Sequence, residues 1–354
     1  MNTRFPNNVI TPCVFHHHRH PYQSATFANK VVSWNTSICR SKRRRRHMSS
    51  HNNSASKNRI LIHDIGKGIK NVQLNRPDKL NSLDMQMFES IAETAMKLKD
   101  DDNIRGIILS GNGKAFCTGL DVKSIVNPSK EHGGLPTTKM NRLLERPSGY
   151  CKDIIQNREN DEDCRGLVNE KKAIGNLAQD VAYLWRSIPV PVIAVLHGMC
   201  FGGGLQIALG ADLRFATKDC RISIMESKWG LIPDMSASIT LRELVRIDVA
   251  KELTFTGRII SGTEAASLGL VTRCIDEDPM EEAIKVMNEI ADRSPDAIAA
   301  AKHLYQSTWV SDEKECLELE SKLQKRLLPS WNQFAASSRT LGLNVSYMKR
   351  KELK

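Results

Sequence analysis

The sequence predicts an α/β fold, and two observations support this prediction. Between residues 60 and 275, short apolar stretches rich in β-branched residues alternate with stretches that repeat apolar residues at helical spacing. The stretch from Pro189 to Asp212, PVPVIAVLHGMCFGGGLQIALGAD, contains no Lys, Arg or Glu. Its first part suits a strand buried on both faces, and its last part suits a buried helix. We therefore expect the α/β core to be built around this stretch.

Ordered structure is expected to begin near Ile60. Two short strands flank Gly66 and Gly68, which is a hairpin pattern. Asp84 can cap a helix that runs to about Lys99, because apolar residues recur there at helical spacing. A further strand follows this helix. The expected ranges are 59–65 and 68–74 for the hairpin, 84–99 for the helix and 105–110 for the next strand.

The middle of the chain contains a polar insertion, and the C-terminal part is helical. Residues 126–170 are rich in charge and lack periodicity, which predicts a long loop or lid. A helix is expected over 171–187. Short strands and helices are then expected at 190–196, 205–210, 213–216, 221–224, 236–246, 248–256, 261–268 and 271–275. Residues 279–328 predict amphipathic helix that is broken at Ser294 and Pro295.

The glycine run from Gly202 to Gly204 separates the expected buried strand from the helix that follows it. Glycine permits tight turns and the close approach of a ligand to the backbone. A turn that opens a helix leaves unpaired N–H groups at the positive end of the helix, so it attracts negative charge. We therefore expect an oxyanion hole. The alternatives are a membrane span, against which the prolines and glycines argue, and a turn that serves packing alone.

The net charge of +11 is concentrated at the N-terminus. Of the 51 lysines and arginines, 11 lie in residues 1–59, which contain no acidic residue, so the remaining 40 balance the 40 acidic residues. Such an arm is typical of a mitochondrial or plastid transit peptide. We expect its removal near residues 47–60 and a location in the mitochondrial matrix, with plastid and peroxisome as lesser alternatives. The rival interpretation is a disordered arm that binds nucleic acid or directs nuclear import through SKRRRRH.

The nine cysteines are scattered without metal-ligand spacing. We therefore expect reduced thiols, no metal site and no disulfide framework. No transmembrane segment or internal repeat is evident.

Four segments together resemble one known family. KAFCTGLDV and AVLHGMCFGGGLQIALGADLRFA resemble the two signatures of the crotonase superfamily, the enoyl-CoA hydratase/isomerase family, and NRPDKLNSL and TGRIISGTEAASLGLVTRCI are similar to family segments in the same order. The resemblance covers Ile60 to Thr308. It implies a crotonase-like spiral of ββα units over 60–275, an acyl-CoA substrate, and a C-terminal helical region (276–354) that forms trimers or paired trimers.

The resemblance also implies which backbone groups bind the acyl-CoA. It assigns the oxyanion hole to the amides of Leu120 and Gly203, where a side chain on Gly203 would collide with the substrate. An enolate that develops beside a thioester needs two such fixed donors in a dry site. The resemblance places the coenzyme A portion beside Lys79 and Leu80 and implies a basic group near the C-terminal helices, for which Lys302 is the candidate and solvated surface charge the alternative. The turn residues expected beside the bound acyl-CoA are Gly119, Asp121 and Gly202.

The acid and base residues narrow the reaction. The family's hydratases resemble one another in carrying a glutamate at the position of Gln206, and an amide cannot transfer protons at neutral pH. Glu226 followed by Asp234 is similar to the family's dienoyl-CoA isomerases, in which the pair moves a proton between distant carbons. Those isomerases carry a further acid where Gln206 stands. The same spacing also resembles the 3-hydroxyacyl-CoA hydrolases, although these have Gly-Gly-Asp where this chain has Leu120-Asp121.

Each candidate also has a structural interpretation. Asp234 could cap the helix expected to begin near Ser236, and Glu226 could pair with Lys228 or Arg221 at the surface. Gln206 could orient a water molecule or a carboxylate. Asp121 is expected to stabilise its turn, and Asp212 to pair with a backbone group or with Arg214.

The sequence as a whole therefore predicts an enzyme that shifts the double bonds of a dienoyl-CoA in fatty acid β-oxidation. The catalytic residues would be Glu226, Asp234, Leu120 and Gly203, and coenzyme A would enter only as part of the substrate. The alternatives are an enoyl-CoA hydratase, a 3-hydroxyisobutyryl-CoA-like hydrolase, and a crotonase-like protein that binds nucleic acid without catalysis. The charge balance beyond residue 59 disfavours the last of these.

Overall fold

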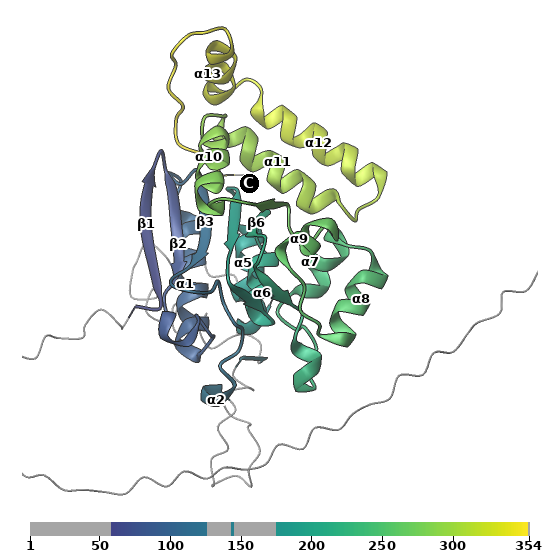
Figure 1. Cartoon of the computed structure of the whole chain (residues 1–354). Helices are drawn as coiled ribbons and strands as arrows, with labels where there is room; N and C mark the ends of the chain where they lie inside the picture. Colours follow the sequence, from purple (N-terminus) through teal and green to yellow (C-terminus); the bar gives the residue numbers. More distant parts are fainter. Residues whose placement is uncertain (1–57, 126–142, 145–174, 353–354) are drawn as a thin grey trace, which may run out of the picture. The chain divides into compact units, whose positions relative to one another are not determined.

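The computed structural model describes residues 58–125, 143–144 and 175–352 (Figure 1). All of these residues fall in one compact unit. The basic arm at 1–59 and the insertion at 126–170 lie almost wholly outside the described residues, so the expectations for both stay predictions.

A six-stranded sheet has the order β1-β2-β3-β4-β6-β8. Its first two strands form the expected antiparallel hairpin, and every other neighbouring pair is parallel. The strands are β1 (Ile60–Gly66), β2 (Ile69–Leu74), β3 (Gly106–Gly111), β4 (Val192–Leu196), β6 (Leu213–Thr217) and β8 (Arg273–Ile275). A second, two-stranded parallel sheet pairs β5 (Met199–Phe201) with β7 (Arg221–Ser223). Strand β5 was not predicted from the sequence, because it forms by pairing with β7, a segment distant in sequence.

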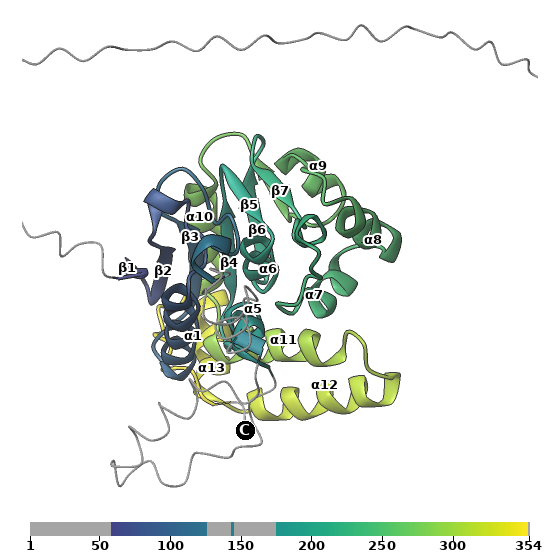
Figure 2. The same ribbon diagram turned by 90° about the horizontal axis from the view of Figure 1, so that it is seen from below.

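The central strands are buried on both faces, as the β-branched sequence predicts. Along β3, Ile107 and Leu109 belong to one hydrophobic cluster, whereas Ile108 between them belongs to the other. Helices α1 (Met85–Asp100) and α5 (Leu177–Ser187) pack in the first cluster, and α10 (Pro279–Ala291) packs in the second (Figure 2). Asp84 caps α1, as expected, by accepting a hydrogen bond from the Met87 amide at 2.8 Å.

The packing of α10 corrects the expected boundary between the core and the helical region. Ala283 and Met287 of this helix lie among core residues of β2, β3, β4 and β6. The helices beyond the core are α11 (Pro295–Thr308), α12 (Glu313–Leu327) and α13 (Trp331–Thr340), and α11 and α12 contact each other (Figure 1). The helix is also interrupted at residues 309–312, where the sequence predicted that it would continue.

Shorter helical elements connect the strands and the larger helices. They are the 3-10 helices η1 (Pro77–Lys79) and η5 (Glu226–Trp229) and the helices α2 (Val122–Ile125), α6 (Gly203–Leu209), α7 (Ala237–Leu244), α8 (Ile247–Thr256) and α9 (Gly262–Ser267). Every residue of α6 is buried, which makes it a rigid support for the segments packed around it.

Candidate active site

Two glycine turns lie against each other at the ends of β3 and β5. The Cys117 amide donates to the Met199 carbonyl at 3.1 Å, and the Phe201 amide donates to the Cys117 carbonyl at 3.0 Å. Gly119 has φ +80, and a Cβ atom there would lie 2.8 Å from the Phe201 oxygen and 3.2 Å from the Gly203 nitrogen. Only glycine lets the first turn approach the second this closely.

The two turns expose the amides that the sequence analysis assigned to the oxyanion hole. Leu83 forms hydrogen bonds with the Gly119 carbonyl and the Asp121 amide, which leaves the Leu120 amide between them free. Gly203 is the first residue of α6, so its N–H group has no acceptor within the helix. Within the described part of the chain, neither amide donates a hydrogen bond.

The requirement for glycine at 203 has a cause that the sequence did not indicate. A Cβ atom at Gly203 would lie 2.8 Å from the Met235 sulfur and 3.1 Å from Leu83 Cδ1. The protein's own side chains therefore already crowd this position, and the expected collision with a substrate stays a prediction.

Glu226 is the buried carboxyl group of the site. Its side chain lies against the second turn, because a Cβ atom on Gly202 would be 3.3 Å from Glu226 Oε1. Gln206 Nε2 donates to the same oxygen at 2.6 Å, whereas Glu226 Oε2 is buried with no hydrogen-bond partner among the described residues. Burial raises the pKa of Glu226, and the Gln206 hydrogen bond opposes that rise. The surface pairing with Lys228 or Arg221 is wrong, because both of those residues are exposed and Glu226 is not.

Asp234 lies on the segment that leads from η5 to α7. The capping alternative is wrong, since the N-cap of α7 is Ser236 and no side chain caps that helix. Asp234 is exposed as a residue, yet the protein around its carboxyl group removes enough hydration to raise its pKa. Its negative charge contributes to the raised pKa of Glu226, so the two carboxyl groups interact.

Of the residues expected beside coenzyme A, Lys79 is an exposed surface residue, whereas Leu80 and Asp121 form hydrogen bonds within the protein. Lys79 is exposed and makes no ion pair within the described residues, and the Leu80 carbonyl accepts a hydrogen bond from the Thr118 amide at 3.2 Å, next to the first turn. Asp121 stabilises its turn, as expected, because it accepts hydrogen bonds from Arg76 Nη1 at 2.8 Å and from the Ser124 amide at 3.3 Å.

Lys302 has neither of the two roles considered for it. Its side chain is 7% exposed and forms an ion pair with Asp212 at 2.8 Å. The same ammonium group also donates to the carbonyls of Trp185 and Val190. Lys302 therefore joins α11 to the core. The Asp212 carboxylate pairs with this lysine and, as expected, with a backbone group, the Val192 amide, whereas the Arg214 side chain donates to the Asp212 backbone carbonyl.

Sequence reasoning did not identify Asn81, which supports the first turn. Its side-chain amide donates to the carbonyls of Asn112, Ala115 and Phe116, and its Oδ1 atom accepts from the Arg76 amide. Asn81 has φ +56, a left-handed conformation that asparagine tolerates. Its place in the NRPDKLNSL segment was the available signal.

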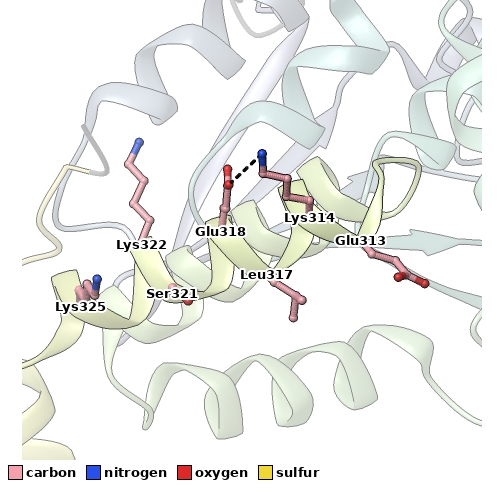
Figure 3. A pocket seen from close by; sticks show the side chains of 7 residues that line it. All are labelled: Glu313, Lys314, Leu317, Glu318, Ser321, Lys322 and Lys325. Carbon is pink, nitrogen blue, oxygen red and sulfur yellow. Dashed lines mark ion pairs between the residues drawn. The ribbon is translucent and has the colours of Figure 1, made fainter.

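Other features of the described residues lie apart from this site. A hollow beside α12 is lined by residues of that helix alone, and two of these residues, Lys314 and Glu318, form an ion pair at 3.9 Å (Figure 3). The described residues contain no group of three or more His, Cys, Asp or Glu side chains that could hold a metal ion. Among the described helices, none is long and apolar enough to cross a membrane.

Comparison with known proteins identifies the family to which the chain is similar. Residues 69–335 match the family described as enoyl-CoA hydratase/isomerase. The chain is 28% identical to the mitochondrial Delta(3,5)-Delta(2,4)-dienoyl-CoA isomerase of Mus musculus over 74% of this chain and 72% of that protein. It is 29% identical to the peroxisomal Delta(3,5)-Delta(2,4)-dienoyl-CoA isomerase of Arabidopsis thaliana over 69% of this chain and 79% of that protein.

A solved structure shares the fold. The enoyl-CoA hydratase from Bacillus anthracis superposes with a TM-score of 0.65 at 23% identity, over 82% of this chain and 98% of that one. The chain therefore has the crotonase fold and belongs to the enoyl-CoA hydratase/isomerase family of the crotonase superfamily.

Proposed function

We propose that this protein is an isomerase that shifts the double bonds of a dienoyl-CoA through an enolate, in the β-oxidation of unsaturated fatty acids. The observation that carries the proposal is the unpartnered, buried Oε2 atom of Glu226, on a side chain that lies against the turn bearing the Gly203 amide. A buried carboxyl oxygen without a donor is costly, so its retention suits a group that accepts a proton from a substrate.

The reaction begins at the carbon next to the thioester. The amides of Leu120 and Gly203 donate hydrogen bonds to the thioester oxygen and stabilise the enolate as its negative charge develops. Each such donor contributes about 3 kcal/mol to lowering the barrier. Glu226 removes the proton from the α-carbon, because its side chain is the carboxyl group beside Gly202. Its raised pKa strengthens it as a base.

Asp234 completes the isomerisation at the far end of the conjugated system. The electron pair released at the α-carbon moves along the chain, and the protonated form of Asp234 delivers a proton to the distant carbon. The raised pKa of Asp234 favours that protonated form. One proton is removed and one is added, with no net change in oxidation state. The reaction therefore needs no metal or redox cofactor, and coenzyme A takes part as a portion of the substrate.

Gln206 favours isomerisation over hydration. Hydration that uses one carboxyl group at position 206 and another at position 226 loses the first of them, because position 206 supplies an amide that neither accepts nor releases a proton at neutral pH. The names of the mouse and Arabidopsis relatives support isomerisation independently, whereas Gln206 itself departs from the further acid expected in the family's isomerases.

The proposed location and the proposed assembly each rest on fewer observations than the proposed reaction does. Relatives named as mitochondrial and as peroxisomal both exist, and the basic, acid-free arm favours the mitochondrial matrix. Sequencing the N-terminus of the mature protein tests this: a start between His47 and Ile60 supports a removed transit peptide, whereas an intact SKRRRRH supports a nucleic-acid-binding arm.

Exposed apolar residues on the C-terminal helices support a homotrimer or a pair of trimers.

The function is tested with the full chain and three acyl-CoA esters, namely a 3,5-dienoyl-CoA, a 2-enoyl-CoA and 3-hydroxyisobutyryl-CoA. Absorbance reports the change in conjugation, and a thiol reagent reports release of coenzyme A. Isomerisation of the dienoyl-CoA without thiol release supports the proposal. Thiol release would identify a hydrolase, loss of the conjugated enoyl absorbance a hydratase, and inactivity on all three would contradict the proposal.

A further inference from the structure

Gln206 has both polar atoms of its side chain engaged inside the site. The residue is 2% exposed, its Oε1 atom accepts a hydrogen bond from the Met235 amide at 2.7 Å, and its Nε2 atom donates to Glu226 Oε1 at 2.6 Å. A backbone amide can only donate, so the carbonyl oxygen of Gln206 must face Met235. The NH₂ group consequently faces Glu226, and the orientation of the amide is determined.

We propose that Gln206 is a positioning residue that holds Glu226 ionised, with Oε2 as its one reactive oxygen, and fixes Glu226 relative to Asp234. This inference rests on the proposed function, and it goes further by giving the amide at position 206 a role in proton transfer by its neighbours. Gln206 itself exchanges no proton.

The first part of the argument is the direction of the hydrogen bond. An N–H donor stabilises a carboxylate oxygen, whereas a protonated oxygen turned towards it would place two donors against each other. Gln206 therefore opposes the desolvation that burial imposes on Glu226, whose side chain belongs to a residue only 9% exposed. With Oε1 occupied by this bond, Oε2 is left to receive the substrate's proton.

The second part concerns the spacing of the two carboxyl groups. Gln206 belongs to α6, whose residues are all buried. From this rigid helix one side chain contacts Glu226 on η5 and the backbone of Met235, the residue next to Asp234. The amide therefore connects the two segments that carry the acid and the base, and a change at position 206 alters both.

The pKa of Glu226 is lowered by the backbone amides of Glu226 and Met225 and by one side chain, that of Gln206, and no nearby cation of the described residues adds to them. Neither α6 nor β5 carries a charged side chain, and Asp234 is the charged residue of the segment from 230 to 236. On η5 itself Lys228 is exposed, in the first turn Asp121 is paired with Arg76, and on α8, which contacts η5, Glu252 is paired with Arg258. The charge of Asp234 raises the pKa of Glu226, whereas the hydrogen bond from Gln206 lowers it.

Two substitutions separate positioning from packing. Q206M keeps the size of the side chain and removes both hydrogen bonds. We expect the acidic limb of its kcat/KM profile to move up by about one to two pH units, which is the worth of a hydrogen bond to a charged group. KM at the pH optimum should stay within about threefold of the wild-type value, because the Gln206 side chain bonds to the protein. The loss of activity should therefore appear in kcat.

Q206E keeps the shape of the side chain and the acceptor for the Met235 amide. Two carboxyl groups 2.6 Å apart cannot both ionise easily, so they share one proton. We expect activity only over the pH range in which one proton is shared, giving a narrower bell-shaped profile than the wild type. A purely structural role for Gln206 predicts that Q206E, which preserves the packing, has the wild-type profile.

A matched control is N71L, which removes the buried hydrogen bond between Ser110 Oγ and Asn71 Oδ1 in the sheet. It should lower the melting temperature while leaving the pH profile unchanged. An unchanged acidic limb in Q206M, or a shift of the same size in N71L, would overturn the inference.

A measurement without turnover separates the inference from the proposed function. Carbon-13 NMR of labelled glutamate side chains in the full chain, assigned by comparison with E226Q, follows the titration of Glu226 directly. A higher pKa in Q206M than in the wild type supports the positioning role even if no acyl-CoA is turned over. Isomerase activity together with an unaltered pKa would support the function and contradict the inference.

Discussion

At the scale of single residues, Glu226 is buried although only one of its two carboxyl oxygens has a hydrogen-bond partner among the described residues. One of its oxygens is held by Gln206 at 2.6 Å, and the other has no partner among the described residues. Folded proteins satisfy most buried polar atoms, and exceptions concentrate where chemistry occurs. Glu226 and Asp234 were predicted as a pair because their spacing in the sequence resembles that of the acid and base in the family's dienoyl-CoA isomerases. The link through Gln206 joins residues 20 positions apart, so only their tertiary contact reveals it.

The substitution E226Q should slow isomerisation severely without weakening the binding of acyl-CoA. The amide cannot accept a proton, so we expect kcat to fall by about 10²- to 10⁴-fold. The affinity for acyl-CoA, measured by calorimetry, should stay within about threefold, since the oxyanion amides are unchanged. E318Q, on exposed α12, is the control and should behave as the wild type. Full activity of E226Q would remove Glu226 from the mechanism.

The same substitution should change how stability depends on pH. Burial raises the pKa of Glu226 above its ordinary value of 4.5, so the folded state binds this proton more tightly than the unfolded state does. The stabilising contribution of the protonated group is complete below pH 4.5 and is lost as the pH rises through the folded-state pKa. E226Q should therefore melt at a higher temperature than the wild type at pH 8. The difference should shrink as the pH falls towards 4.5, and a difference independent of pH would contradict this account.

At the scale of elements, the site depends on the contact between two glycine turns. Strands β3 and β4 bring the turns to the same end of the sheet, and the bonds between Cys117, Met199 and Phe201 join them. The sequence predicted both turns, because glycine runs after apolar strands are local signals. It did not predict β5 or the crowding of Gly203 by Met235 and Leu83, since these depend on segments distant in sequence.

The substitution G119A should separate the turns. A Cβ atom there would meet the Phe201 oxygen at 2.8 Å, in addition to the cost of φ +80 for alanine. We expect a loss of about 2–4 kcal/mol in the free energy of unfolding and a parallel loss of kcat. The control is G66A, where φ is +96 and no atom lies within 4 Å of the new Cβ. It should cost about 1 kcal/mol and leave kcat unchanged. Equal effects of the two substitutions would show that the contact is unimportant.

The substitution K302M tests the attachment of α11 to the core. It leaves the carboxylate of Asp212 without its ion pair, and we expect a loss of about 3–5 kcal/mol in the free energy of unfolding, measured with denaturant. The KM for acyl-CoA should not change in the folded variant. K314M, which breaks the exposed pair on α12, should cost less than about 0.5 kcal/mol. A raised KM with unchanged stability would restore the expected phosphate role of Lys302.

At the scale of the whole molecule, the C-terminal helices leave large apolar side chains uncovered. Trp309, which follows the last residue of α11, and Leu317 of α12 are each 63% exposed, and the two helices contact each other. A second copy of the chain would remove such surface from water. The described residues show the surface, whereas the trimer itself is an expectation from family resemblance.

A double substitution, W309E with L317E, should therefore prevent assembly. We expect the wild type to sediment as a trimer or hexamer in analytical ultracentrifugation and the variant to sediment as a monomer, because two charges would be buried without partners at the interface. I62E, which also replaces an exposed apolar residue but lies on β1, is the control and should not alter the mass. A monomeric wild type would contradict the proposed assembly.

The sequence by itself determined the α/β class, the strand and helix order of the core, the two glycine turns and the candidate acid and base. The class, the order of elements and the turns follow from local signals, namely periodicity, capping residues and glycine turns, whereas the candidate acid and base follow from the family resemblance. The tertiary structure alone decided that α10 belongs to the core, that Lys302 is an internal ion pair, and that Gln206 orients Glu226. Each of those facts depends on which distant side chains share a dry environment, and folding sets that environment through packing rather than through neighbours in sequence.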